Sequence, residues 1–128
     1  MDWRTWVIIG GAVAAFLFLK RLILVRPDTA RAWLQKGARV IDVRSEGAFQ
    51  GRHLPGAVNI PLDRLRDEIP RLAPDKEQPL LLHCLSGTRS GIGKTLIKKL
   101  GYRNVFNLGS YGRAKKILGM QSGVGRKG

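Results

Sequence analysis

The sequence predicts an α/β fold, a parallel sheet flanked by helices on both faces, preceded by one N-terminal transmembrane helix. Residues 80–83 include three leucines and no polar alternation, which is typical of a strand buried on both faces of a parallel sheet. A helical pattern follows at once, with apolar residues at Ile92, Leu96, Ile97 and Leu100. The third observation is an uncharged apolar run near the N-terminus, at residues 6–19.

The N-terminal run predicts a membrane anchor over residues 1–26. Its uncharged part is shorter than the roughly 20 residues of a usual span. Trp3 and Thr5 extend one end, and the long side chains of Lys20 and Arg21 can reach the interface at the other. We therefore expect residues 5–25 to contact the membrane. The alternative is a helix that packs on a partner or lies in the interface.

The order of charges predicts the orientation of this anchor. Basic residues gather after the apolar run, whereas a secretory signal peptide carries its positive charge first and a small-residue cleavage site afterwards. The positive-inside rule then places the following domain in the cytoplasm. We expect a single-pass protein of the inner (cytoplasmic) membrane.

The folded domain is expected over residues 27–119, with strands and helices in alternation. Asp28 is a candidate N-cap for a helix over 29–35, and a strand follows at 39–43. A helical turn at 46–49 precedes a second strand at 58–60. An amphipathic helix begins near Leu62, and Pro70 is expected to end or kink it.

The second half of the domain repeats this order. The strand at 80–83 leads through a polar loop to a helix from Ser90, and a last short strand is expected at 105–107. A helix over 110–118 with Ser110 as its cap follows. Residues 120–128 are glycine-rich and basic, so a disordered tail is expected there.

The single cysteine, Cys84, stands where the buried strand ends and the loop begins. A strand-to-helix loop turns backbone N–H groups and a helix N-terminus towards its centre, which favours an anion. With Arg89 nearby, a thiolate at Cys84 is expected to have a lowered pKa, as a nucleophile requires. A lone cysteine after an apolar strand is also typical of an inert buried thiol, but such a thiol needs no polar loop after it.

Several segments together resemble one family. Residues 83–90, His-Cys-Leu-Ser-Gly-Thr-Arg-Ser, resemble the active-site loop of single-domain rhodaneses, which are sulfurtransferases. Residues 40–46 and 53–61 resemble two further rhodanese segments, and residues 101–108 resemble the approach to the last strand. The likeness covers about residues 28–119. It implies a rhodanese-like parallel sheet for the domain.

The resemblance implies a thiosulfate:cyanide sulfurtransferase-like enzyme without a cofactor. Cys84 would carry sulfane sulfur as a persulfide from a donor such as thiosulfate to a thiol or cyanide. The implied active-site loop consists of Leu85, Ser86, Gly87, Thr88 and Arg89. Asp42, Arg44 and Ser90 are implied as supporting residues, although Asp42 and Arg44 also fit an ordinary surface pair.

Three other classes of protein are alternatives to a sulfurtransferase. Related phosphatases use Cys-x5-Arg, which would require arginine at position 90, where the chain has Ser90. A P-loop would require glycine at position 88, where the chain has Thr88. A non-enzymatic, membrane-anchored rhodanese module that binds or localises a partner stays open.

Composition narrows the expected partners. The net charge is +14, from 23 lysines and arginines against nine acidic residues. Aromatic residues are not interleaved with the basic ones, so we expect an anionic membrane surface rather than nucleic acid as the partner of this charge. One cysteine excludes an internal disulfide, and no metal site is expected because no pair of ligands has the right spacing.

Overall fold

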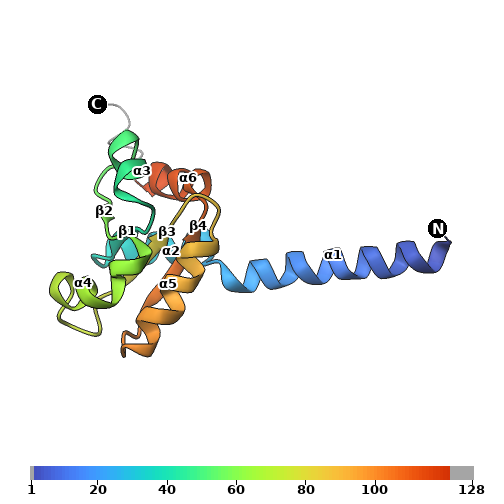
Figure 1. Cartoon of the computed structure of the whole chain (residues 1–128), viewed down its shortest axis with the longest axis horizontal. Helices are drawn as coiled ribbons and strands as arrows, with labels where there is room; N and C mark the ends of the chain where they lie inside the picture. The colour runs from blue at the N-terminus through green and yellow to red at the C-terminus, as the bar shows by residue number, and fades with distance from the viewer. Residues whose placement is uncertain (1, 122–128) are drawn as a thin grey trace.

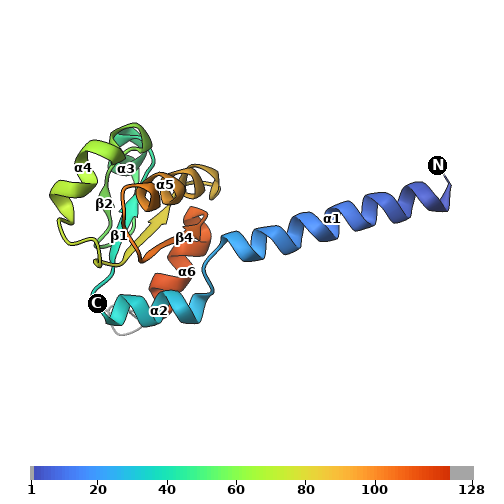
Figure 2. The same cartoon turned by 90° about the horizontal axis from the view of Figure 1, so that it is seen from below.

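The computed structural model describes residues 2–121 as an α/β domain from which one long helix projects (Figures 1 and 2). The chain begins with two helices and then alternates strands and helices. The strands are β1 (Arg39–Asp42), β2 (Val58–Asn59), β3 (Leu80–His83) and β4 (Val105–Gly109). The helices are α1 (Trp3–Ile23), α2 (Pro27–Gln35), α3 (Glu46–Gly51), the 3₁₀ turn η1 (Leu62–Arg64), α4 (Leu65–Leu72), α5 (Thr88–Lys99) and α6 (Tyr111–Gln121).

The four strands form one parallel sheet in the order β2-β1-β3-β4. Ile41 of β1 lies between Val58 of β2 and Leu82 of β3, which fixes the register of the sheet. The predicted α/β class with a parallel sheet is therefore confirmed. Since β1 and β3 are the two inner strands, the loops after Asp42 and His83 leave the same edge of the sheet side by side.

Each face of the sheet carries its own hydrophobic core, because neighbouring strand residues point to opposite faces. On one face Ile41 and Leu82 pack with Leu65 and Ile69 of α4 and with Ile97 of α5. The other face packs against α2 and α6, through the cluster that includes Ala30, Val40, Leu81, Ala114 and Ile117. Helices thus cover both faces, as the sequence predicts.

Helix α1 extends away from the domain, as both views show (Figures 1 and 2). Many apolar side chains along it are exposed, including Trp6, Ile8 and Phe16. Within residues 2–121, no helix meets both the length and the apolarity that a membrane span requires. The predicted transmembrane helix is therefore unsupported. In the sequence, Arg4 on one side and Lys20 and Arg21 on the other limit the uncharged run to residues 5–19, which is shorter than the roughly 20 residues of a usual span.

Several element boundaries differ from the predicted ones, among them those of three helices. Helix α2 begins at Pro27, so Asp28 lies in its first turn, paired with Arg31, instead of capping it. Helix α4 continues through Pro70 to Leu72. Helix α5 begins at Thr88, two residues earlier than expected, with Gly87 as its N-cap. Residues 122–128 of the predicted tail lie outside the described residues.

Helix α5 approaches the sheet closely at Gly93, and this contact gives a first prediction. A Cβ atom there would lie 2.8 Å from Leu65 Cδ1 and 3.0 Å from Leu82 Cδ2, both on buried side chains. We expect Gly93→Ala to lower the free energy of unfolding by about 1–3 kcal/mol through overpacking, measured by urea denaturation. The matched control is Gly112→Ala in α6, where no atom lies within 4 Å and no loss is expected. Equal stabilities of the two variants would contradict the close contact.

Candidate active site

Cys84 follows the last residue of β3 and opens the loop that leads into α5. Its side chain is buried, and its backbone N–H donates to the Gly109 carbonyl at 3.2 Å, which ties the loop to the end of β4. Gly87 then turns the chain with φ +97°, a conformation that side chains with a Cβ rarely adopt. The turn bends the backbone around the sulfur and starts the helix.

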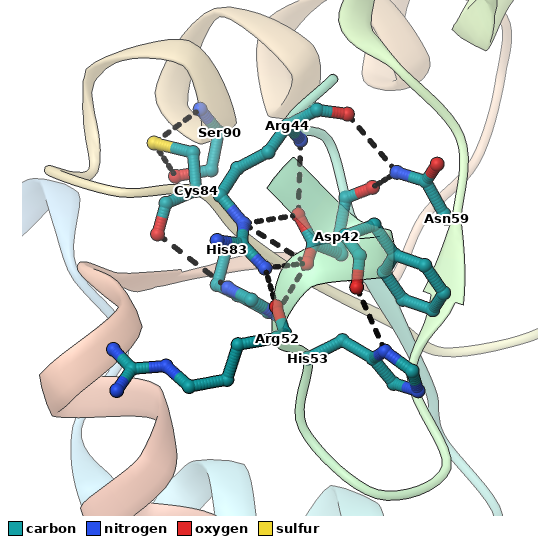
Figure 3. A network of polar contacts seen from close by, with 9 residues as sticks. Asp42, Arg44, Arg52, His53, Asn59, His83, Cys84 and Ser90 are labelled. Atoms are coloured by element: carbon teal, nitrogen blue, oxygen red, sulfur yellow. Dashed lines mark hydrogen bonds and ion pairs between the residues drawn. The ribbon is translucent and has the colours of Figure 1, made fainter. Parts of the chain in front are cut away.

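The sulfur is the centre of a small set of hydrogen bonds. The backbone N–H of Gly87 donates to Sγ at 2.9 Å, and that of Ser90 donates at 3.4 Å. The Ser90 hydroxyl lies 3.4 Å from Sγ (Figure 3). Donors converging on one atom at a helix N-terminus are an arrangement that stabilises negative charge. The site therefore suits a thiolate, or a persulfide anion attached to it.

The pKa of Cys84 reflects two opposing causes. Burial raises the pKa of the thiol, but hydrogen bonds from the Ser90 hydroxyl and from the amides of Ser90, Gly87 and Ser86 lower it by more. The pKa therefore lies below the ordinary value for cysteine. A lowered pKa is the property that a nucleophilic thiol requires, whereas burial alone would raise the pKa.

A pH profile checks this property. Because the pKa is lowered, the thiolate forms at a lower pH in the folded chain than in an unfolded one. We expect the rate of Cys84 alkylation by iodoacetamide, plotted against pH, to rise at a lower midpoint than in a peptide spanning residues 80–90. A midpoint at or above that of the peptide would contradict the role of the loop amides.

The remaining residues of the predicted loop face outwards. Leu85, Ser86, Thr88 and Arg89 are exposed. The Leu85 carbonyl accepts the N–H of Tyr111 at 3.2 Å, and Ser86 pairs with Ser110, so the outer side of the loop is held by the start of α6. Arg89 lies in the first turn of α5, and the largest causes that lower the pKa of Cys84 are the hydrogen bonds described above.

Asp42 and Arg44 form a buried ion pair beside the loop. Asp42 is fully buried and Arg44 nearly so. Arg44 Nη2 lies 2.8 Å from Asp42 Oδ2, Nε donates to both carboxylate oxygens, and the Arg44 N–H donates to Oδ1 at 2.9 Å. Nη2 also donates to the Arg52 carbonyl at 2.6 Å. The reading as an ordinary surface pair is therefore wrong, because water does not reach this carboxylate.

His83 lies on the same face of the sheet as Asp42. Its Nε2 is buried, 3.8 Å from Asp42 Oδ2, without a hydrogen-bond partner among the described residues. Burial lowers the pKa of His83, so the ring is neutral at pH 7. The ring contacts Cys84 through its backbone carbonyl, at 3.5 Å, rather than through the thiol. Neighbouring residues at the end of a strand point to opposite sides, and the His83 ring accordingly does not lie against the Cys84 thiol as a paired base would.

Tyr111 packs against the buried residues His83 and Arg44 and against a second arginine, Arg52. The ring packs edge-on to His83, and the guanidinium groups of Arg44 and Arg52 lie 4.9 Å and 4.7 Å from its centre. Arg52 is exposed, and its side chain points away from Asp42 (Figure 3). His53 stacks on Phe49, and its Nδ1 lies 2.8 Å from the Phe49 carbonyl oxygen, so this ring is held against α3.

Sequence reasoning missed one buried polar residue, Asn107 of β4. Its side chain contacts Gly87, Ser90 and Gly109, so it lies directly behind the loop. The one feature of the sequence that could have identified Asn107 is its position as a polar residue in an otherwise apolar strand. Among residues 2–121, no three histidine, cysteine or acidic side chains are grouped so that they could hold a metal ion.

The comparison with protein families decides the identity of this fold. A model described as a Rhodanese-like domain matches residues 26–112, more than half of the chain. The chain belongs to the rhodanese family. The matched part of this rhodanese includes Cys84 and the loop that follows it.

Named relatives agree with the family. The thiosulfate sulfurtransferase PspE of Escherichia coli strain K12 is 38% identical over 69 residues, covering 54% of this rhodanese and 66% of PspE. The match thus spans just under two thirds of PspE. YqhL of Bacillus subtilis strain 168, an uncharacterized protein, is 33% identical over 97 residues, or 75% of each chain.

Solved structures also resemble this rhodanese. A rhodanese with anions from E. coli has a TM-score of 0.58 at 34% identity, covering 60% of this chain and 91% of the other. The human single-domain sulfurtransferase TSTD1 has a TM-score of 0.63 at 29% identity, covering 73% and 96%. Both matches cover nearly all of the other chain.

Proposed function

We propose that this rhodanese is a sulfurtransferase that moves sulfane sulfur from a donor such as thiosulfate to a thiol or to cyanide. The observation that carries the proposal is the set of donors around Cys84 Sγ, the Gly87 and Ser90 amides with the Ser90 hydroxyl. The names of PspE and TSTD1 support the same reaction class.

The proposed reaction has two balanced steps. The Cys84 thiolate attacks the outer sulfur of thiosulfate, the S–S bond of the donor breaks, and sulfite leaves with the electron pair. Cys84 then carries a persulfide anion. Cyanide or a thiolate attacks the outer sulfur of that persulfide, forms thiocyanate or a new persulfide, and regenerates the Cys84 thiolate.

The loop residues have distinct proposed roles. The Gly87 and Ser90 amides stabilise the Cys84 thiolate that begins and ends the cycle, since their N–H groups are fixed before the donor arrives. The exposed Arg89 and Arg52 are the proposed contacts for an anionic donor, and the buried Asp42–Arg44 pair supports the loop from beneath.

Mass spectrometry of the purified full chain after thiosulfate treatment tests the proposal. We expect the mass to increase by one sulfur atom, the increase to map to Cys84, and cyanide to reverse it. The Cys84→Ser variant is the control and should gain no mass. If the folded wild-type chain gains no sulfur from any sulfane donor, the non-enzymatic binding module becomes the better description.

We also propose that α1 keeps this rhodanese at the cytoplasmic membrane surface. Support comes from the exposed apolar side chains of α1 and from the net charge of +14, which favours an anionic leaflet. Flotation with anionic vesicles tests it against a chain that lacks residues 1–23. If both forms fail to float, membrane attachment is excluded.

A further inference from the structure

The Asn107 side chain joins three parts of the site from behind. Its Nδ2 donates to the Gly87 carbonyl at 3.1 Å. Its Oδ1 accepts the Ser90 hydroxyl at 2.7 Å and the Gly109 N–H at 2.8 Å. The residue is completely buried, so water cannot replace these contacts. Asn107 does not touch the sulfur, and any effect on Cys84 must pass through Ser90 or Gly87.

The Ser90 hydroxyl has one proton but three acceptors within reach. These are Asn107 Oδ1 at 2.7 Å, the Gly87 carbonyl at 3.2 Å and Cys84 Sγ at 3.4 Å. A hydroxyl donates a single hydrogen bond, so these contacts exclude one another as donor interactions. The short distance to Asn107 marks that oxygen as the preferred acceptor while the sulfur is uncharged.

The preferred acceptor of the Ser90 hydroxyl proton changes when Cys84 ionises. In the thiol state the S–H group donates to Ser90 Oγ, and Ser90 donates to Asn107, which makes a continuous chain of hydrogen bonds. A thiolate has no proton and attracts donors more strongly than a neutral amide oxygen does. Rotation about the Cβ–Oγ bond of Ser90 then moves the proton to the sulfur without moving a heavy atom.

We propose that Asn107 is a positioning residue that sets the ionisation of Cys84 by competing with its sulfur for the Ser90 proton. Asn107 Oδ1 holds that proton in the thiol state and releases it to the thiolate. Its second acceptor contact, from the Gly109 N–H, persists in both states, so the amide keeps its orientation during the exchange. The inference concerns the thiolate itself and holds whether or not the chain transfers sulfur.

The pH dependence of Cys84 alkylation by iodoacetamide tests this inference, because alkylation requires no sulfur donor. Asn107→Leu removes the competing acceptor. At a pH below the midpoint of the alkylation profile, the fraction of Cys84 present as thiolate should therefore rise about three- to tenfold, which corresponds to the free energy of one hydrogen bond. Asn107→Asp should lower that fraction, since a carboxylate binds the proton more tightly and repels the thiolate. Asn104→Leu is the matched control, since Asn104 bonds to the Glu77 carbonyl, away from the loop.

A double-mutant comparison separates positioning from loosening of the loop. In the Ser90→Ala background, Asn107→Leu should leave the alkylation midpoint unchanged, because no hydroxyl proton remains to compete for. The inference is overturned if the Leu effect persists undiminished without Ser90, or if Leu and Asp shift the midpoint in the same direction. Should Asn107→Leu fail to fold, the near-isosteric Asn107→Asp decides: it must lower the fraction less in the Ser90→Ala background than with Ser90 present.

Discussion

Replacing Gly87 by alanine is expected to slow persulfide formation about 10²–10³-fold, the usual effect of losing one fixed donor to a developing anion. Gly87 has φ +97°, and a Cβ there would lie 3.2 Å from Gly109 Cα. That contact is with backbone, which cannot swing aside. The loop must therefore shift, and the 2.9 Å bond from the Gly87 N–H to Cys84 Sγ is the contact at risk.

The control for this prediction is Gly37→Ala. Gly37 has a similar φ of +92°, but nothing lies within 4 Å of the added Cβ, and the residue follows α2, outside the Cys84 loop. We expect a loss of stability of about 1–2 kcal/mol from the left-handed conformation and an unchanged rate of persulfide formation. Stopped-flow measurement with thiosulfate compares the two. A Gly87→Ala chain with the wild-type rate would show that the amide is dispensable.

Asp42→Ala is expected to lower the free energy of unfolding by about 3–5 kcal/mol, the cost of leaving one partner of a buried pair unpaired. Arg44 would keep its buried position but lose four hydrogen bonds to Asp42, three of them from its side chain. Arg44 would stay charged in this variant, because a guanidinium is not deprotonated in proteins, so its buried charge would have no partner.

Glu46→Ala provides the comparison, because Glu46 pairs with Arg64 on the exposed surface. An exposed pair contributes under about 1 kcal/mol, so urea denaturation should separate the two variants clearly. Joint replacement of Asp42 and Arg44 by Leu and Met should recover much of the loss, since no buried charge remains. If Asp42→Ala were no more harmful than Glu46→Ala, the pair would not support the sheet edge.

Most of the fold can be predicted from the sequence, because its apolar residues follow regular strand and helix patterns. The leucines of β3 fit only a strand covered on both faces, and the clusters on the two sides of the sheet follow from that. Helix ends were harder to place. Gly87 precedes α5 in a left-handed conformation and lies against the backbone of Gly109, a residue far along the chain.

The site residues within one local motif were predictable from the sequence. Those brought together by the pairing of separate strands were not. Cys84 and its loop follow from residues 83–90. The burial of the Asp42–Arg44 pair follows from the pairing of β1 with β3 and from the Arg52 carbonyl eight residues on. Asn107 reaches the loop because β4 lies beside β3, which spacing along the chain does not reveal.

The segment between α1 and α2 has a consequence for shortened forms of the chain. β4 is the outer strand of the sheet, and the Val25 N–H donates to the Asn107 carbonyl on its open side at 2.9 Å. Leu24 covers Gly109, and Arg113 donates to the Val25 carbonyl. A form that starts at Pro27 would leave this edge uncovered as a template for a strand from another molecule, which invites self-association. A form that starts at Leu24 keeps the edge closed.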